Sequence, residues 1–495
     1  MATSVPAYIL GQAQKSFHAA ETADHPRKLM SEIALAALED AAIEPSAVDA
    51  VGCVDPLSWT YPELAKSVAA DMGCNKGVRE FWLPGGGTTP QDLTHEIAIA
   101  MDAGEIDIAV IFGAEAMRTR RKATRAGKML DWPARDKSVK AMRGQKPFTS
   151  PWEAQHGLRL PIQSFPMLEN ALRTANVRSA SAQINIAAKL LHKNALVAEK
   201  NPHAWFQKPP SIGEISEVTA ENRMISYPYT KRMNAIMDVD QAAAIVIVSD
   251  KYLNASGRRS RAAAILGGAG AEEVWNPMQR PSLSTCVGME VAFEATLNSA
   301  GVKVEDIDAF DLYSCFPVPV ELALDTLKVS LNDPRPFTMT GGLAFGGGPG
   351  NNYVMHSLAT AVAHLRDNQE EVIMITGVGM ANTKHAATIL AAAEKVPNAA
   401  TGKTVYRLAT GDKEIPVARE ASGTCTIATY TIEYDRTGIA TNIIYILDTA
   451  KGERAIANAR NPTDTAYVLL SCDPIGRSGE LSWDADLDQQ FFELD

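Results

Sequence analysis

The chain has 495 residues, more than one hydrophobic core usually organises, so its length predicts about two to four domains. Hydrophobic residues make up 46% and charged residues 21%, which is globular usage and excludes a disordered or fibrous chain. The 58 Asp and Glu residues outnumber the 47 Lys and Arg residues, and a net charge of −11 argues against nucleic acid as a partner.

The sequence offers no membrane span, targeting segment or metal site. It has no run of about eighteen apolar residues, and the first ten residues lack the pattern of a signal peptide. The six cysteines form no CxxC pair and are too few for a disulfide framework. His95 and Glu96 are followed by Ile99 where a zinc-protease helix needs its second histidine. We therefore expect a cytoplasmic protein with reduced thiols and no metal.

Two stretches near the N-terminus predict helix–strand units. Residues 32–51 form an apolar-faced helix, a turn and the start of a strand. Residues 85–117 carry a glycine turn, an amphipathic helix that contains His95, and an apolar β-branched run. The following stretch, 118–235, opens with a basic run and is interrupted by prolines, so it predicts an excursion from this first half. The strand 242–249 returns to the core.

The second half repeats the first. Residues 290–310 match 32–51 with one inserted residue, and residues 346–380 match 85–117, with His356 in the place of His95. Alternating strands and helices predict an α/β fold with parallel sheets covered on both faces, and both glycine turns should face one central crevice. After residue 395, β-branched and aromatic runs predict a small β domain. The predicted domains are 1–255 with its excursion 118–235, then 256–395, and then the β domain 396–495.

The order of these motifs resembles that of the thiolases. The matching segments are 222–248, 309–316 (AFDLYSCF) and 341–353 (GGLAFGGGPGNNY), and the resemblance covers residues 5–392. With the added β domain, the chain most resembles type-1 thiolase-like proteins, which are usually labelled acetyl-CoA acetyltransferases. The resemblance implies a duplicated, layered αβαβα fold with a small C-terminal β-barrel-like domain. It also implies a homodimer and an acyl-CoA substrate, so that coenzyme A enters as part of the substrate and no cofactor is bound covalently.

The chain departs from the thiolase pattern at the catalytic positions. Gly87 stands where the resemblance places the nucleophilic cysteine, and Gly348 stands where it places the histidine of Gly-His-Pro. Residues 371–385 lack the acid–base cysteine. Lipid-transfer-type thiolases carry His-Asp-Cys-Phe where residues 313–316 read Tyr-Ser-Cys-Phe, so only Cys315 and Phe316 match. Because glycine cannot carry an acyl group, we expect no acyl-enzyme.

The remaining candidates follow from these motifs. Glycine turns before helices present N–H groups to a thioester oxygen, and the basic run could hold CoA phosphates. Close-packing turns, buried tyrosines, core histidines, a buried thiol and a solvated basic loop remain the plainer alternatives. The thioester-binding candidates are Gly86, Gly87, Gly348 and Gly379. The catalytic candidates are Tyr313, Tyr353, Cys315, His356 and His385, and the phosphate-binding candidates are Arg118, Arg120, Arg121 and Lys122.

Two kinds of function fit these residues. The first is an enzyme that makes or breaks a carbon–carbon bond in an acyl-CoA, with retro-aldol cleavage of a β-hydroxyacyl-CoA as one example. There Tyr313 and Tyr353 would serve as base and proton relay, which requires a depressed phenol pKa or help from His356 or His385. The second is a catalytically silent CoA-binding, lipid-binding or assembly protein.

Overall fold

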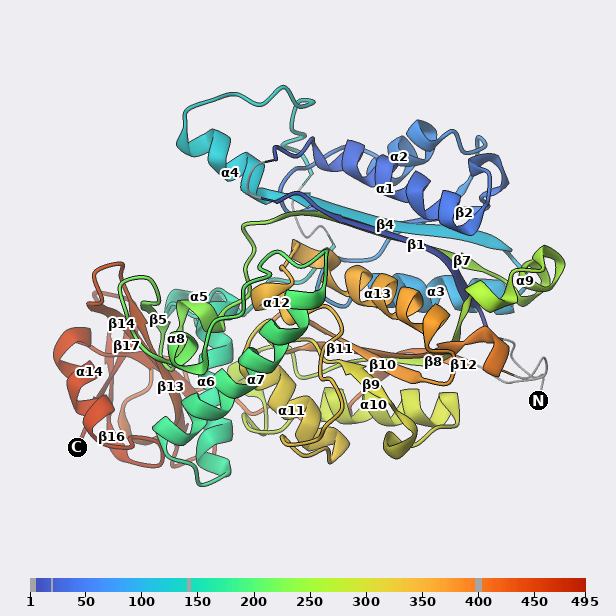
Figure 1. The fold of residues 1–495 in the computed structure, drawn as a ribbon. Coiled ribbons are helices and arrows are strands. Elements are labelled where there is room, and N and C mark those ends of the chain that lie inside the picture. The colour runs from blue at the N-terminus through green and yellow to red at the C-terminus, as the bar shows by residue number, and fades with distance from the viewer. Residues whose placement is uncertain (1–5, 19–20, 140–143, 397–402) are drawn as a thin grey trace.

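The structure is a computed structural model that describes residues 6–18, 21–139, 144–396 and 403–495. Its helices and strands form a large two-sheet core, an excursion and a C-terminal barrel (Figure 1). No helix in these ranges is both long and apolar enough to cross a membrane. The same ranges contain no cluster of His, Cys, Asp and Glu side chains that could hold a metal ion.

The first half is a five-stranded sheet in the order β3-β2-β4-β7-β1. Strands β4 and β7 are buried at every position, because helices cover both faces of the sheet. The strands are β1 (Tyr8–Ser16), β2 (Ala50–Val54), β3 (Arg79–Phe81), β4 (Ile108–Ala116) and β7 (Asp240–Val248). The helices are α1 (Pro26–Ala41), α2 (Leu64–Met72), α3 (Thr89–Asp102) and α9 (Asp250–Ser256).

The second half repeats this topology, in the order β9-β10-β11-β8. In each half a parallel pair (β2 with β4, β9 with β10) is followed by two antiparallel pairs, which confirms the predicted duplication, and β3 adds a second parallel pair to the first half. The strands are β8 (Ala263–Glu272), β9 (Ala309–Asp311), β10 (Val372–Gly379), β11 (Lys384–Ala392) and β12 (Lys403–Ala409). The helices are α10 (Val287–Ala300), α11 (Pro317–Leu327), α12 (Gly342–Phe345) and α13 (Tyr353–Asp367).

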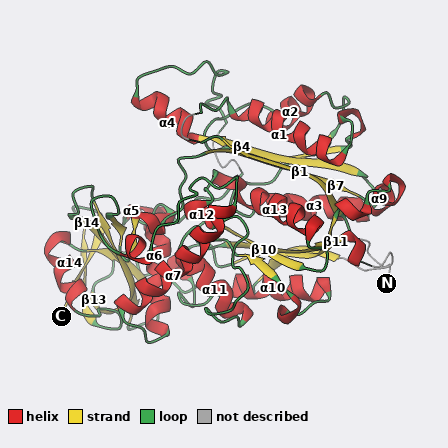
Figure 2. Ribbon diagram, viewed as in Figure 1, coloured by secondary structure: helices red, strands yellow, loops and turns green. Residues whose placement is uncertain are grey.

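The two halves stack in five layers, as Figure 2 shows, with α3 and α13 in the middle layer between the sheets. The prediction of parallel sheets was wrong in part, because both sheets are mixed. Strand β11 follows β10 through a short turn, and such a connection makes neighbouring strands antiparallel. The sheets meet where β1 pairs with β8 over two residues, Tyr8 with Ala264 and Ile9 with Ala263.

The excursion and the C-terminal region pack against each other beside the core (Figure 1). Strands β13 to β17 form a five-stranded barrel, because β13 pairs with β14 as well as with β16. The excursion contains α4 (Met117–Arg125), α5 (Pro151–Gln155), α6 (Pro161–Ala175), α7 (Ala180–Lys200), α8 (Ile212–Ser216), β5 (Met224–Ser226) and β6 (Tyr229–Thr230). The barrel contains β13 (Gly423–Tyr434), β14 (Ala440–Thr449), β15 (Arg454–Asn458), α14 (Pro462–Ser471), β16 (Ser478–Asp484) and β17 (Gln489–Leu494).

Strand β12 lies inside the predicted β domain 396–495 but pairs in parallel with β8 of the core. The barrel itself begins at β13. We therefore propose that the C-terminal domain starts in the segment between β12 and β13, and that the expected boundaries 1–255 and 256–395 delimit the two core halves.

Candidate active site

A cavity of about 810 Å³ lies where the two halves meet the excursion. Both glycine turns and the Tyr313 loop line it, as the predicted central crevice requires. Residues from the excursion supply much of the wall, and most of the lining side chains are apolar. The lining comprises Leu57, Gly86, Gly87, Gly144, Gln145, Lys146, Pro147, Phe148, Arg159, Leu160, Pro161, Ile162, Phe165, Asn234, Ala235, Met237, Tyr313, Cys315, Phe316, Leu343, Gly348, Gly350, Asn351, Val378 and Met380.

Tyr313 occupies the space in front of Gly87, the position that the resemblance assigns to the nucleophile. A Cβ placed on Gly87 would come within 2.5 Å of Tyr313 Oη and closer still to the carbonyl oxygen of Val378. Residue 87 therefore cannot carry a side chain unless Tyr313 and the backbone of Val378 move. The tyrosine hydroxyl therefore stands at the start of α3, where a thiolase would carry its thiol.

The Tyr313 hydroxyl donates to no other residue in the described ranges, and Tyr313 lines the cavity. Burial raises the pKa of Tyr313 well above the usual value for a phenol. A base role requires the opposite shift, so the expected role of Tyr313 as a base is not supported. At neutral pH the phenol keeps its proton and is available as a hydrogen-bond donor to a ligand.

Tyr353 lies against Tyr313, with the rings edge to face and their centroids 5.5 Å apart, but Tyr353 does not line the cavity. Its hydroxyl is paired with Thr340 Oγ1 at 2.5 Å and donates to Asp311 Oδ1 at 3.4 Å. Burial, and then the charge of Asp311, raise the pKa of Tyr353. The predicted relay role does not fit a hydroxyl whose partners are buried core groups.

The candidate thioester donors differ from one another. The N–H of Gly87 has no partner among the described residues, so it is available to a ligand. The N–H of Gly348 donates to the carbonyl oxygen of Ile236 at 2.9 Å and is already used. Gly379 is the last residue of β10 and packs against the N–H of Gly87 instead of lining the cavity. The hydrogen bond at Gly348 therefore does not support its predicted role as a thioester donor.

Cys315 lines the cavity, but burial raises the pKa of its thiol, so it carries no thiolate near neutral pH. Its carbonyl oxygen accepts the N–H of Ala235 at 3.0 Å. This bond ties the Tyr313 loop to the return segment of the excursion. The position of Cys315 fits a wall residue better than a nucleophile.

Neither candidate histidine lines the cavity. His356 Nδ1 is 3.1 Å from Gln14 Oε1, and burial lowers its pKa to about 3. His385 Nε2 is 3.1 Å from Cys286 Sγ, and burial lowers its pKa to about 4. His95, the counterpart of His356, is fully buried beside Thr388 Oγ1. The catalytic roles predicted for His356 and His385 do not fit these places, and the core-packing alternative does.

The basic run lies on α4, outside the large cavity. Arg120 donates to the Ser58 carbonyl oxygen at 2.9 Å, and Arg121 pairs with Asp238 at 3.6 Å. Arg118 and Lys122 line a separate hollow of about 420 Å³, together with Arg125, Ala126 and Asp238. Of the four predicted phosphate-binding residues, only Arg118 and Lys122 thus line this hollow, and Arg118 also lies 3.9 Å from Asp240.

Three further cationic residues lie at the site, and the sequence alone did not identify them as candidates. Lys146 and Arg159 line the main cavity and are exposed at its edge. Lys384 begins β11, is buried, and pairs with Asp92 at 3.5 Å. A Cβ on Gly86 would lie 3.9 Å from Lys384 Nζ, so this positive charge stands beside the glycine turn. No periodicity or motif marks these three positions, and only folding brings them to the site.

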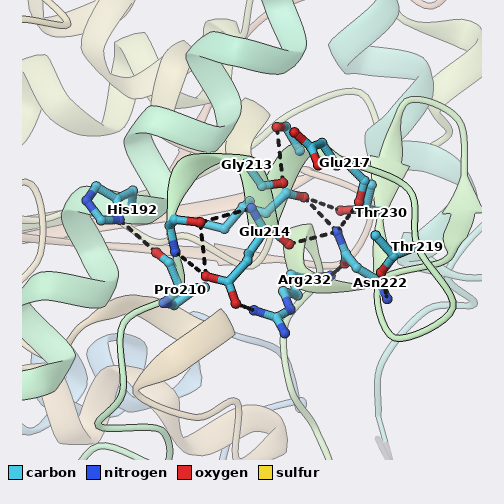
Figure 3. Close-up of polar contacts among 12 residues, drawn as sticks. His192, Pro210, Gly213, Glu214, Glu217, Thr219, Asn222, Thr230 and Arg232 are labelled. Atoms are coloured by element: carbon cyan, nitrogen blue, oxygen red, sulfur yellow. Dashed lines mark hydrogen bonds and ion pairs between the residues drawn. The ribbon is translucent and has the colours of Figure 1, made fainter.

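Asn222 fixes the end of the excursion, as Figure 3 shows. Its amide nitrogen donates to three backbone carbonyl oxygens in α8 and the residue after it, at 2.9–3.0 Å. Its amide oxygen accepts the N–H of Arg232 at 2.9 Å. The chain is thereby held just before Asn234, Ala235 and Met237, which line the cavity.

Comparison with known proteins agrees with this architecture. A family model described as the thiolase-like protein type 1 additional C-terminal domain matches residues 409–486. The crystal structure of a monomeric SCP2-thiolase-like protein type 1 from Mycobacterium smegmatis is similar over 100% of both chains, with 27% identity and a TM-score of 0.81. The Ltp2-ChsH2(DUF35) aldolase shares the fold at 21% identity and a TM-score of 0.61, over 80% of this chain and 100% of that one.

Among curated proteins, sterol carrier protein 2 of Oryctolagus cuniculus is 24% identical over 165 residues, or 33% of this chain. The match spans only 29% of the length of that relative. The whole-length structural match and the matched C-terminal domain point to the same family. The chain is similar over its full length to a thiolase-like protein of type 1 of the thiolase superfamily, and residues 409–486 match the additional C-terminal domain of that family.

Proposed function

We propose that the cavity binds an acyl-CoA and that its chemistry proceeds without an acyl-enzyme. The volume of about 810 Å³ and the apolar lining suit the acyl group of a CoA thioester. The thioester oxygen faces the free N–H of Gly87 and the hydroxyl of Tyr313. The superfamily contains enzymes, an aldolase among them, so an active protein is the expected case.

The reaction we propose is retro-aldol cleavage of a β-hydroxyacyl-CoA. The β-hydroxyl loses its proton, the Cα–Cβ bond breaks to leave a carbonyl at Cβ, and the bonding pair forms an enolate on the thioester. A proton then adds to Cα and gives the shortened acyl-CoA. The observation that carries this proposal is the position of the Tyr313 hydroxyl in front of Gly87. Because burial raises its pKa, the phenol would keep its proton there and donate it in a hydrogen bond to the enolate oxygen.

The described residues that line the cavity include no carboxylate and no imidazole. We therefore propose that water in the cavity accepts the β-hydroxyl proton, so that the cleavage rate rises with pH. This same lack of a base favours the second candidate, a silent acyl-CoA-binding protein. Cleavage of the substrate distinguishes the two, because both bind it.

A matched pair of variants tests the role of Tyr313. Tyr313→Phe removes a hydroxyl that faces the cavity, and Tyr353→Phe removes one that is bonded within the core. We expect Tyr313→Phe to lower kcat for β-hydroxyacyl-CoA cleavage about a hundredfold, the scale of an acid–base group, with acyl-CoA affinity retained. Tyr353→Phe should lose about 1 kcal/mol of stability and keep its turnover. Equal turnover in both variants contradicts the mechanism, and binding without cleavage by the wild type identifies the silent protein.

For the CoA phosphates we propose Lys146 and Arg159, because they are at the cavity, with the α4 hollow as the competing site. Reversing both charges should weaken CoA binding more at low salt than at high salt. The double variant Arg118→Glu, Lys122→Glu is the matched control, and a larger effect there assigns the phosphates to α4.

We also propose a monomer, as in the Mycobacterium smegmatis protein, which gives no support to the expected homodimer. Light scattering decides between them.

A further inference from the structure

The C-terminal barrel packs against the helix that forms one wall of the cavity. Helix α6 begins at Pro161, and four residues at its start line the cavity: Leu160, Pro161, Ile162 and Phe165. Phe165 stacks on Phe316 of the Tyr313 loop, with centroids 4.7 Å apart and an interplanar angle of 16°. The position of α6 therefore sets the distance between the outer wall and the Tyr313 loop.

Contacts with the barrel run along the length of α6. Asn170 Nδ2 donates to the carbonyl oxygen of Tyr430 at 2.9 Å, and Thr429 Oγ1 donates to that of Met167 at 2.5 Å. Near the C-terminal end of α6, Arg173 forms a bidentate ion pair with Asp473, and both N–O distances are 2.7 Å. Because most of these partners are buried, the helix cannot shift without breaking several bonds.

One side chain connects the barrel directly to the lining. Gln163 Oε1 accepts the N–H of Leu160 at 2.7 Å, and its Nε2 donates to Glu433 Oε1 of β13 at 2.8 Å. The other oxygen of Glu433 accepts from Asn442 of β14 at 3.0 Å, so the carboxylate is itself held in place. Gln163 is buried, which leaves its amide no alternative partner in water.

We propose that the barrel is a specificity element of the cavity, with Glu433 acting as a positioning residue through Gln163 on the start of α6. The ligand class is the acyl group of a CoA thioester, so this inference rests on the proposed function. The coenzyme portion makes no contact with Glu433 in this scheme. Loss of the Glu433 carboxylate should therefore change the discrimination between acyl groups and leave the affinity for free CoA unchanged.

The test compares Glu433→Ala with two controls. Glu433→Gln keeps a carbonyl oxygen for Gln163, and Glu480→Ala makes the same truncation at an exposed position of the same barrel. The first readout needs no ligand: amide hydrogen exchange at the start of α6, including the N–H of Leu160, should quicken about tenfold in Glu433→Ala alone. The second is calorimetric binding of CoA, hexanoyl-CoA and decanoyl-CoA. The ratio of the two acyl-CoA affinities should change at least threefold, with CoA itself unchanged.

Each outcome has a distinct meaning. Unchanged exchange at the start of α6 overturns the link from the barrel to the cavity wall. Faster exchange with an unchanged affinity ratio overturns the specificity role. Equal weakening of CoA and both acyl-CoAs shows a merely structural effect and also overturns it. If the wild type binds no acyl-CoA, the proposed function fails and the specificity role fails with it, whereas the exchange result still reports on the barrel contacts.

Discussion

Replacement of Gly87 by alanine tests whether the nucleophile position is closed. The new Cβ would lie 2.5 Å from Tyr313 Oη and 2.9 Å from Tyr313 Cζ, and closer still to the Val378 carbonyl oxygen. Real Cβ atoms keep at least 3.0 Å from such neighbours, so the Tyr313 ring must move by about half an ångström and the β10 backbone by more. Overpacking of this kind costs about 1–3 kcal/mol.

Gly86→Ala is the matched control, because its Cβ would meet only the end of the Lys384 side chain at 3.9 Å. For a cooperative unit of about 150–250 residues, the cost at Gly87 lowers the melting temperature by about 2–12 °C. Scanning fluorimetry should show this drop in Gly87→Ala and none in Gly86→Ala. Gly87→Cys should behave like Gly87→Ala and form no acetyl-enzyme with acetyl-CoA, as mass spectrometry would report. Equal melting temperatures for the two alanine variants refute the reasoning.

Two further predictions concern buried titratable groups. Burial, and then the charge of Glu321, raise the pKa of Glu169, so the folded protein holds a proton that the unfolded chain releases above about pH 4.3. Stability therefore falls as pH rises from there, and Glu169→Gln should flatten this fall between pH 5 and pH 8 in urea titrations; an unchanged slope contradicts it. Because burial also raises the pKa of Cys315, iodoacetamide should label it more slowly at pH 8 than Cys472, and acyl-CoA should slow it further. Mass spectrometry measures the labelling of each cysteine. If Cys315 is labelled as fast as Cys472, Cys315 lies outside the cavity.

The duplication could be predicted because hydrophobic periodicity and glycine turns recur along the chain in the same order. Periodicity marks which residues are buried, but it carries no information on strand direction. The prediction of parallel sheets therefore missed the antiparallel pairing of β4 with β7 and of β10 with β11. Direction depends on where each connection crosses, and the long excursion before β7 left that open.

The two tyrosines show a similar limit at the site. Tyr313 and Tyr353 each lie within a recognisable motif, and motif and residue type together made both of them catalytic candidates. Their difference lies in a third element, because Asp311 of β9 and the nearby Thr340 bind one hydroxyl and not the other. A pattern in the sequence identifies a side chain with catalytic potential, but the partner that satisfies it comes from elsewhere in the fold.

The two glycine turns also differ because of a distant segment of the fold. Duplication gives the two halves corresponding turns at Gly87 and Gly348, and the corresponding positions suggest two corresponding donors. The excursion is inserted in only one half, and its return segment brings Ile236 against Gly348, whose N–H it accepts. Gly87 has no such neighbour and keeps its N–H for a ligand. The insertion therefore makes the site asymmetric, and we propose that a bound thioester places its reacting oxygen at the α3 turn, beside Tyr313 and Lys384.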